Sequence, residues 1–126
     1  MRSKILNPNL PKKEQLETLL DRNAAAICQG NYESVRCAHW LLNAAGIVHE
    51  VCFGYAILYY ENDQYGDSEL VRPHWWIKCE NLIIDYCLKF QLSLGGQLQS
   101  SGVFEADPKR IRYISYDLPL QQKALL

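Results

Sequence analysis

The pair His74 and Asp85 is the feature of this sequence best suited to chemistry. His74 lies in the segment RPHWWIKC, residues 72–79, and Asp85 ends the apolar part of the segment NLIIDYC, residues 81–87. A carboxylate that accepts a hydrogen bond from an imidazole N–H fixes the tautomer of the ring and stabilises its protonated form. Such a pair can take a proton from a nucleophile and return it to a leaving group, as acyl transfer and hydrolysis require.

Two adjacent antiparallel strands are the elements that would hold these two side chains together. Both segments are rich in β-branched and aromatic residues, and Glu80 and Asn81 between them are short enough for a hairpin turn. We expect a bend at Gly54 in an earlier strand, and an edge position for the last strand, because Pro119 ends it. The residues between the last two strands are predicted to be a loop. The predicted strands of the sheet are about 47–60, 71–79, 82–87 and 110–117.

Two helices are predicted before the strands. Apolar residues recur at helical spacing over 11–28, and Pro11 fits the first turn of that helix. A second helix over about 31–45 is richer in apolar residues; Asn31 is its expected N-cap and Gly46 its end. We therefore expect an α+β fold in which the second helix is buried against an antiparallel sheet.

Length and charge restrict the classes of function. The 126 residues fit a single domain, 1–126, with one core, and the formal net charge is −1 without a long run of one sign. This balance predicts neither nucleic acid nor an anionic membrane as a partner. Because the sequence contains neither a spanning apolar run nor the apolar stretch of a signal peptide, a cytoplasmic location is expected.

The cysteines and histidines do not show the spacing of a metal site. Five cysteines are an odd number, and the paired CxxC spacing is missing, so we expect neither a disulfide framework nor a structural zinc ion. Cys37, Cys52 and Cys87 are interpreted as small core residues. His39 is expected on a helix face and His49 exposed on a strand, neither with a partner.

Several short motifs resemble, in order and approximate spacing, those of the transglutaminase-like branch of the papain-like superfamily. They are Gly46-Ile47, Gly54-Tyr55, His74-x-Trp76-Ile77 and Ile84-Asp85. The resemblance covers roughly residues 28–90 and is strongest to the small bacterial transglutaminase-like cysteine proteinases. It implies a papain-like core and acyl transfer or hydrolysis at an amide of a protein or peptide. No cofactor or metal is implied.

The resemblance also implies roles for individual residues. His74 would be the general base, Asp85 would orient it, and backbone N–H groups near residues 31–33 would stabilise the oxyanion. Residues expected beside the substrate are Asn31, Tyr55 and Trp76.

The nucleophile departs from the family pattern. Tyr32 stands where the family has its nucleophilic cysteine, at the start of the buried helix. A phenol, with an ordinary pKa near ~10, is a poor substitute for a thiol near ~8.5. Cys28, one helical turn earlier, is the alternative nucleophile.

Two hypotheses follow. The first is an active amide hydrolase or acyltransferase that uses Cys28 or a hydroxyl group. The second is a transglutaminase-like pseudoenzyme in which Tyr32 has replaced the nucleophile and the cleft binds a protein or peptide partner.

Overall fold

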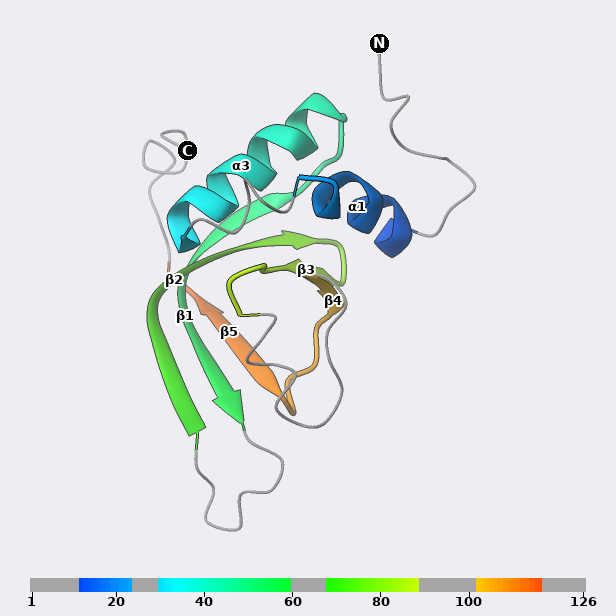
Figure 1. The fold of residues 1–126 in the computed structure, drawn as a ribbon. Helices are drawn as coiled ribbons and strands as arrows, with labels where there is room; N and C mark the ends of the chain where they lie inside the picture. Colours follow the sequence, from blue (N-terminus) through cyan, green and yellow to red (C-terminus); the bar gives the residue numbers. More distant parts are fainter. Residues whose placement is uncertain (1–11, 24–29, 60–67, 89–101, 117–126) are drawn as a thin grey trace.

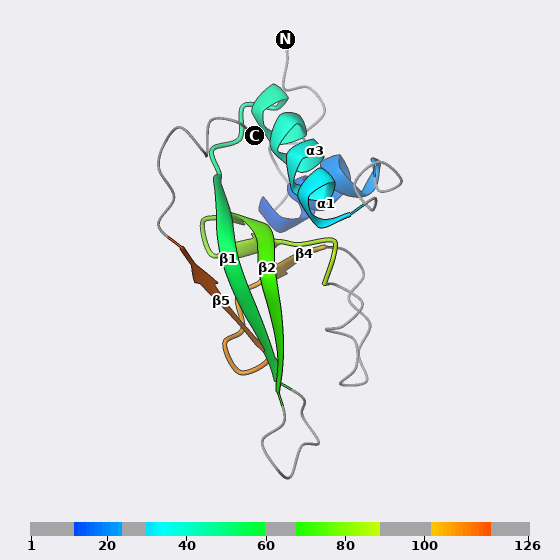
Figure 2. The same cartoon turned by 90° about the vertical axis from the view of Figure 1, so that its left-hand side faces the viewer.

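The computed structural model describes residues 12–23, 30–59, 68–88 and 102–116 (Figure 1). They form an α+β fold with a five-stranded antiparallel sheet in the order β4-β3-β2-β1-β5. The two helices lie together at one end of the sheet, and the β1–β2 hairpin extends away from them (Figures 1 and 2). The helices are α1 (Lys12–Asp21) and α3 (Asn31–Ala44). The strands are β1 (Glu50–Tyr59), β2 (Ser68–Cys79), β3 (Leu82–Ile84), β4 (Val103–Glu105) and β5 (Ile111–Ser115).

Both faces of the sheet carry apolar clusters. On the helix side, α1 and α3 pack on residues of β2, β3 and β4 that include Ile77, Ile84 and Val103. The other face is a separate cluster to which β1, β2, β3, β4 and β5 contribute. Its buried members are Cys52, Ala56, Leu58, Trp76, Ile83, Leu88, Phe104 and Ile111. Since both faces are covered near the middle of the sheet, a polar side chain there must find its partners within the protein.

At Gly54 the backbone of β1 lies very close to the backbone of β5. The register of β1 with β2 shifts between Gly54 and Ala56, at the bend that the sequence predicts. A Cβ atom on Gly54 would overlap the carbonyl oxygen of Ile114 in β5. Only glycine lets the two strands approach this closely.

Tyr86, which follows β3, forms a hydrogen bond to the end of α1. Its hydroxyl donates to Asp21 Oδ1 at 2.5 Å, and its ring fills the space that a side chain at position 102 would need, where the residue is Gly102. Burial, followed by the effect of Asp21, raises the pKa of Tyr86 far above its ordinary value. The phenol therefore remains a hydrogen-bond donor throughout the neutral range.

Some predicted helix boundaries are wrong. α1 ends at Asp21, well before position 28; Pro11 and residues 24–29 lie outside the described residues. Gly30, at φ 147°, is the N-cap of α3, and Asn31 is the first helical residue without a capping bond from its side chain. The end of α3 is as predicted, because Gly46 follows it with the positive φ of 73° that glycine readily adopts.

The strand predictions differ from the structure mainly at their ends. β1 starts at Glu50 instead of 47, β2 already starts at Ser68, and β3 stops at Ile84, so Asp85 lies just beyond it. The two-residue turn at Glu80-Asn81 and the edge position of β5 are confirmed. Pro119 lies outside the described residues. The predicted loop before β5 was wrong in part, because it contains β4, which pairs with β3.

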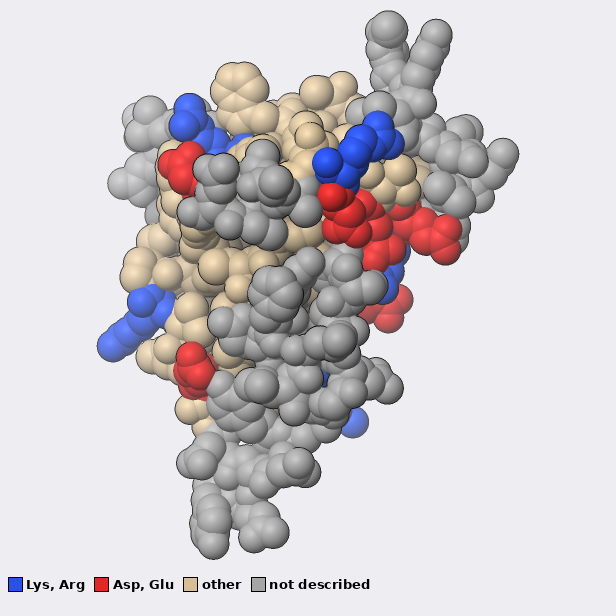
Figure 3. All heavy atoms as spheres, in the orientation of Figure 1, with Lys and Arg blue, Asp and Glu red and all other residues tan. Residues whose placement is uncertain are grey.

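The described surface is mixed in charge on the face drawn in Figure 3. Aspartate and glutamate side chains gather at the right-hand edge of this view, with lysine or arginine beside them, and the other charged side chains drawn lie scattered among uncharged areas. One exposed ion pair, Lys12 Nζ to Glu80 Oε1 at 3.4 Å, links α1 to the β2–β3 turn. Neither helix in the described part of the chain is long and apolar enough to cross a membrane.

Candidate functional site

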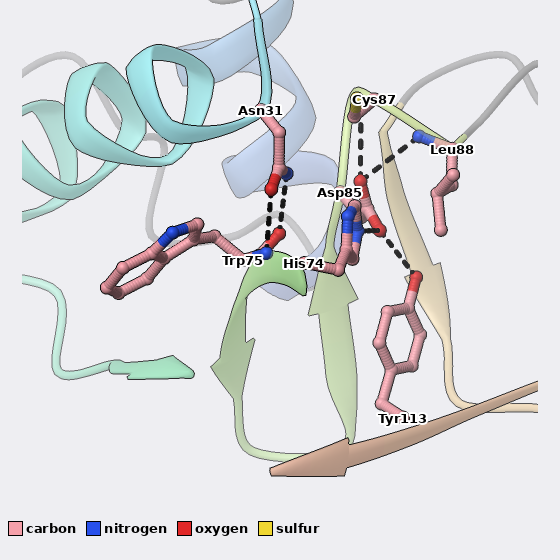
Figure 4. Close-up of polar contacts among 7 residues, drawn as sticks. All are labelled: Asn31, His74, Trp75, Asp85, Cys87, Leu88 and Tyr113. Atoms are coloured by element: carbon pink, nitrogen blue, oxygen red, sulfur yellow. Dashed lines mark hydrogen bonds and ion pairs between the residues drawn. The ribbon is translucent and has the colours of Figure 1, made fainter. Parts of the chain in front are cut away.

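His74 and Asp85 are brought together as the hairpin register requires. Ile77 of β2 lies opposite Ile84 of β3, so Asp85, the next residue, can reach back toward His74 along β2. His74 Nε2 lies 2.7 Å from Asp85 Oδ2 (Figure 4). Only 1% of His74 and 2% of Asp85 are exposed. The pair is thus shielded from water, which strengthens the interaction between the imidazole and the carboxylate.

Asp85 is held by four hydrogen-bond donors. Its Oδ1 accepts from the backbone N–H groups of Cys87 and Leu88, both at 3.1 Å. Its Oδ2 accepts from His74 and from the hydroxyl of Tyr113, the latter at 2.8 Å (Figure 4). With donors on both oxygens the group acts as a carboxylate, which only accepts. It follows that His74 Nε2 carries a hydrogen and donates to Asp85, and that in the neutral ring Nδ1 holds the free lone pair.

Tyr113 is a member of the site that the sequence analysis missed. It lies on β5 opposite Ala56, and its ring packs against those of Trp76 at 4.8 Å and His74 at 6.3 Å between centroids. Burial, and then the adjacent Asp85, raise the pKa of Tyr113 well above its ordinary value. The phenol is therefore a permanent donor to Asp85. The only available signal was the alternation of RIRYIS, which puts Tyr113 on the same face as Ile111.

Asn31 fixes the start of α3 to the strand that carries His74. Its Nδ2 donates to the carbonyl oxygen of Trp75 at 2.8 Å, and its Oδ1 accepts from the Trp75 N–H at 2.7 Å. β3 pairs with β2 only over Ile77–Cys79, so the backbone of Trp75 has no strand partner on that side, and Asn31 takes its place. Figure 4 shows Asn31 beside the strand, with the rings of Trp75 and His74 projecting to opposite sides.

Tyr32 does not face His74. Its side chain is 39% exposed, and its ring packs edge-on against Trp75, with 5.5 Å between centroids. No hydrogen bond joins Tyr32 to His74, although both residues are described. The residue at the expected nucleophile position thus lies on the Trp75 side of β2, away from the free nitrogen of His74.

The aromatic residues expected beside a substrate lie elsewhere. Trp76 is 2% exposed and has no free face; its ring stacks on that of His74 with 6.2 Å between centroids. It supports the histidine from within the core. Tyr55 is half-buried on the opposite face of β1 from Ala56, and its ring contacts Tyr116 at 5.9 Å. The structure does not bring Tyr55 to the His74–Asp85 pair.

The cysteines divide into buried and accessible ones. Cys52 and Cys79 are buried, and Cys37 is half-buried against the helix-side cluster. Burial raises the pKa of the Cys79 thiol, which makes it a weak nucleophile. Cys87 is exposed in the turn after β3, so its interpretation as a core residue was wrong. Cys28 lies outside the described residues.

No family model, curated protein or solved structure matches this chain. The function is therefore inferred from the residues of the site and their geometry. These are a buried imidazole with one free nitrogen, a fully bonded carboxylate, and a helix N-terminus tied to the same strand.

Proposed function

We propose that the protein is a transglutaminase-like domain with a papain-like core that hydrolyses or transfers at an amide of a protein or peptide. In this proposal His74 is the general base, Asp85 orients it and Cys28 is the nucleophile. The observation that carries the proposal is the state of His74. Its Nε2 is bound to Asp85, while its Nδ1 has no hydrogen-bond partner among the described residues, although the side chain is buried.

A histidine kept only for stability would be expected to use both nitrogens. A buried polar group without a partner costs about 1–3 kcal/mol, so such groups are rare unless they serve another purpose. Here the carboxylate holds the hydrogen on Nε2, which makes Nδ1 the basic nitrogen. Nδ1 is then ready to take a proton from a thiol or hydroxyl group.

The proposal assigns the oxyanion role to the start of α3, which meets β2 at Trp75, whose ring projects to the opposite side of the strand from His74. In a helix of 14 residues the first N–H groups, those of residues 31–33, lack partners within the helix and can stabilise negative charge. Asn31 holds these groups beside the strand of His74. Cys28 lies three positions before Asn31 in the sequence and outside the described residues. The proposal requires its thiol at the helix N-terminus, where the thiolate is favoured.

The reaction would proceed in two steps. His74 Nδ1 takes the proton of the Cys28 thiol, the sulfur bonds to the amide carbon, and the C–N bond breaks as the amine leaves with the proton from His74. Water, or an amine acceptor, then gives its proton to His74 and attacks the thioester, which releases the thiol. Asp85 keeps the imidazole in one tautomer through both steps.

The test is acylation by an activated ester, p-nitrophenyl acetate, followed by intact mass and peptide mapping of the full chain. We expect one acetyl group on Cys28, removable by hydroxylamine. The label should be lost in Cys28→Ala and strongly reduced in His74→Gln, whose amide can still donate to Asp85. A control, Glu105→Gln, changes an exposed side chain on β4 outside the site and should acylate normally. Equal acylation of wild type and Cys28→Ala would contradict the proposal.

A second candidate function is favoured by the position of Tyr32. Its ring packs on Trp75 instead of facing His74, as expected if the helix start has lost its nucleophile. The domain would then bind a protein or peptide partner without chemistry. Absence of any acylated Cys28 in the same assay would favour this function over the first.

A further inference from the structure

His39 and His49 form a pair that the acyl-transfer site does not use. His39 lies on α3, and His49 lies just before β1 and is half-buried, so its predicted place as an exposed strand residue was wrong. His39 Nδ1 lies 2.8 Å from His49 Nε2, and the ring centroids are 5.0 Å apart. Neither residue contacts His74, and the pair lies toward the opposite end of α3 from Asn31.

The outer nitrogens of the pair are held by other groups. His49 Nδ1 lies 2.7 Å from the carbonyl oxygen of Ile47, to which it must donate. His49 Nε2 is therefore an acceptor directed at His39. His39 Nε2 lies 3.3 Å from the side-chain amide of Asn43. A histidine that ligates a metal almost always donates its other N–H to a carbonyl or carboxylate, as His49 does here.

The separation of the rings is close to that of two histidines on one metal ion. With metal–nitrogen distances of about 2.05 Å and a tetrahedral angle, two imidazole centroids lie about 5.2 Å apart and the nitrogens about 3.3 Å apart. The observed centroid distance of 5.0 Å already agrees. A small tilt of each ring would widen the 2.8 Å nitrogen separation by about half an ångström.

The geometry points to a binding site for a divalent transition metal ion of the zinc type, with His39 Nδ1 and His49 Nε2 as ligands. A surface hollow of about 330 Å³ adjoins the pair. It is lined by His39, Asn43, Gly46, Ile47, Val48 and His49. Each water occupies about 30 Å³, so the hollow has room for the ion and the waters that complete its coordination. No third His, Cys, Asp or Glu joins the pair among the described residues, which makes the site open and exchangeable.

Binding needs only a change of tautomer. His39 can ligate an ion through Nδ1 only when its hydrogen lies on Nε2. Its hydrogen moves from Nδ1 to Nε2 through solvent, and the Asn43 amide turns so that its oxygen accepts it. Both inner nitrogens then present lone pairs to the ion, and no net proton is released. The ion would link the end of α3 to the segment that enters β1.

The test is isothermal titration of the full chain with zinc chloride near pH 7.5, with thiols controlled by a Cys28→Ser/Cys37→Ser/Cys87→Ser variant. We expect saturable binding in the wild type and in the cysteine variant, and a rise in Tm on binding. Affinity should fall at least about tenfold in His39→Ala and in His49→Ala, and rise in Asn43→Asp, which adds a carboxylate. In nitrogen-detected NMR, zinc should shift the His39 hydrogen to Nε2.

Two outcomes would overturn this site. One is the absence of binding at millimolar zinc, with wild-type Tm unchanged. The other is equal binding by wild type and a His39→Ala/His49→Ala variant. Neither outcome depends on acylation of Cys28, so the failure of this site and the failure of the proposed function are distinguishable.

Discussion

Asn31→Ala is the perturbation that most sharply tests how the helix and the strand are joined. The variant removes two hydrogen bonds, of 2.8 and 2.7 Å, and leaves the N–H and the carbonyl of Trp75 without partners. An unsatisfied buried group costs about 1–3 kcal/mol, and because these groups lie at a partly buried strand edge, water will recover part of that cost. We therefore expect the free energy of unfolding to fall by about 2–4 kcal/mol.

Urea unfolding followed by circular dichroism measures the free energy of unfolding, and amide hydrogen exchange at Trp75 measures how well that N–H is protected. Exchange at the Trp75 amide should accelerate in Asn31→Ala, and Asn31→Asp, which keeps the acceptor only, should lie between the two. Glu33→Ala, an exposed change on the same helical turn, should cost only about 0.5 kcal/mol. A loss below about 1 kcal/mol in Asn31→Ala with unchanged exchange would refute the bridging role.

Three further predictions concern Gly54, Tyr113 and Tyr86. Gly54→Ala should lower the free energy of unfolding, measured by thermal unfolding, by about 3 kcal/mol or more, because the added Cβ overlaps the Ile114 carbonyl oxygen. A loss below about 1 kcal/mol would show that β5 lies elsewhere. Tyr113→Phe removes a hydrogen bond to a charged acceptor and should cost about 1.5–3 kcal/mol in urea unfolding; a neutral change would mean that Asp85 does not accept it. The third concerns pH: burial raises the pKa of Tyr86 and of Tyr113, so the folded state holds these protons more tightly than the unfolded state. The stability that these two phenols contribute is complete below the ordinary tyrosine pKa near ~10 and is lost as pH rises above it. Above that pH the free energy of unfolding of a Tyr86→Phe/Tyr113→Phe variant should therefore fall less steeply with pH than that of the wild type. Parallel plots of unfolding free energy against pH for the two proteins would contradict this.

Local signals sufficed for the hairpin that joins His74 and Asp85. The two-residue turn at Glu80-Asn81 fixes the pairing, and the alternation of side chains then decides which residues share a face. These two rules put Asp85 on the same face as His74, one pair of positions along β2, where the two side chains can meet.

The rest of the site depends on contacts between distant segments. Tyr113 reaches Asp85 only because β5 returns to pair with β1, and the short β4 is a strand only because β3 offers it a partner. Asn31 has the propensity of an N-cap, but its side chain instead satisfies the open backbone of Trp75, 44 positions away. The pairing of His39 with His49 likewise depends on how the chain turns between α3 and β1.

The most direct test of the central claim is the rate at which iodoacetamide alkylates Cys28 near neutral pH, read by peptide mapping. A thiol activated by His74 reacts as thiolate and should be labelled faster than the exposed Cys87, which serves as an internal reference. In His74→Gln the rate at Cys28 should drop to that of Cys87 or below, while Cys87 is unchanged. Slow labelling of Cys28 in the wild type, unaffected by the substitution, would contradict a working Cys28–His74 pair.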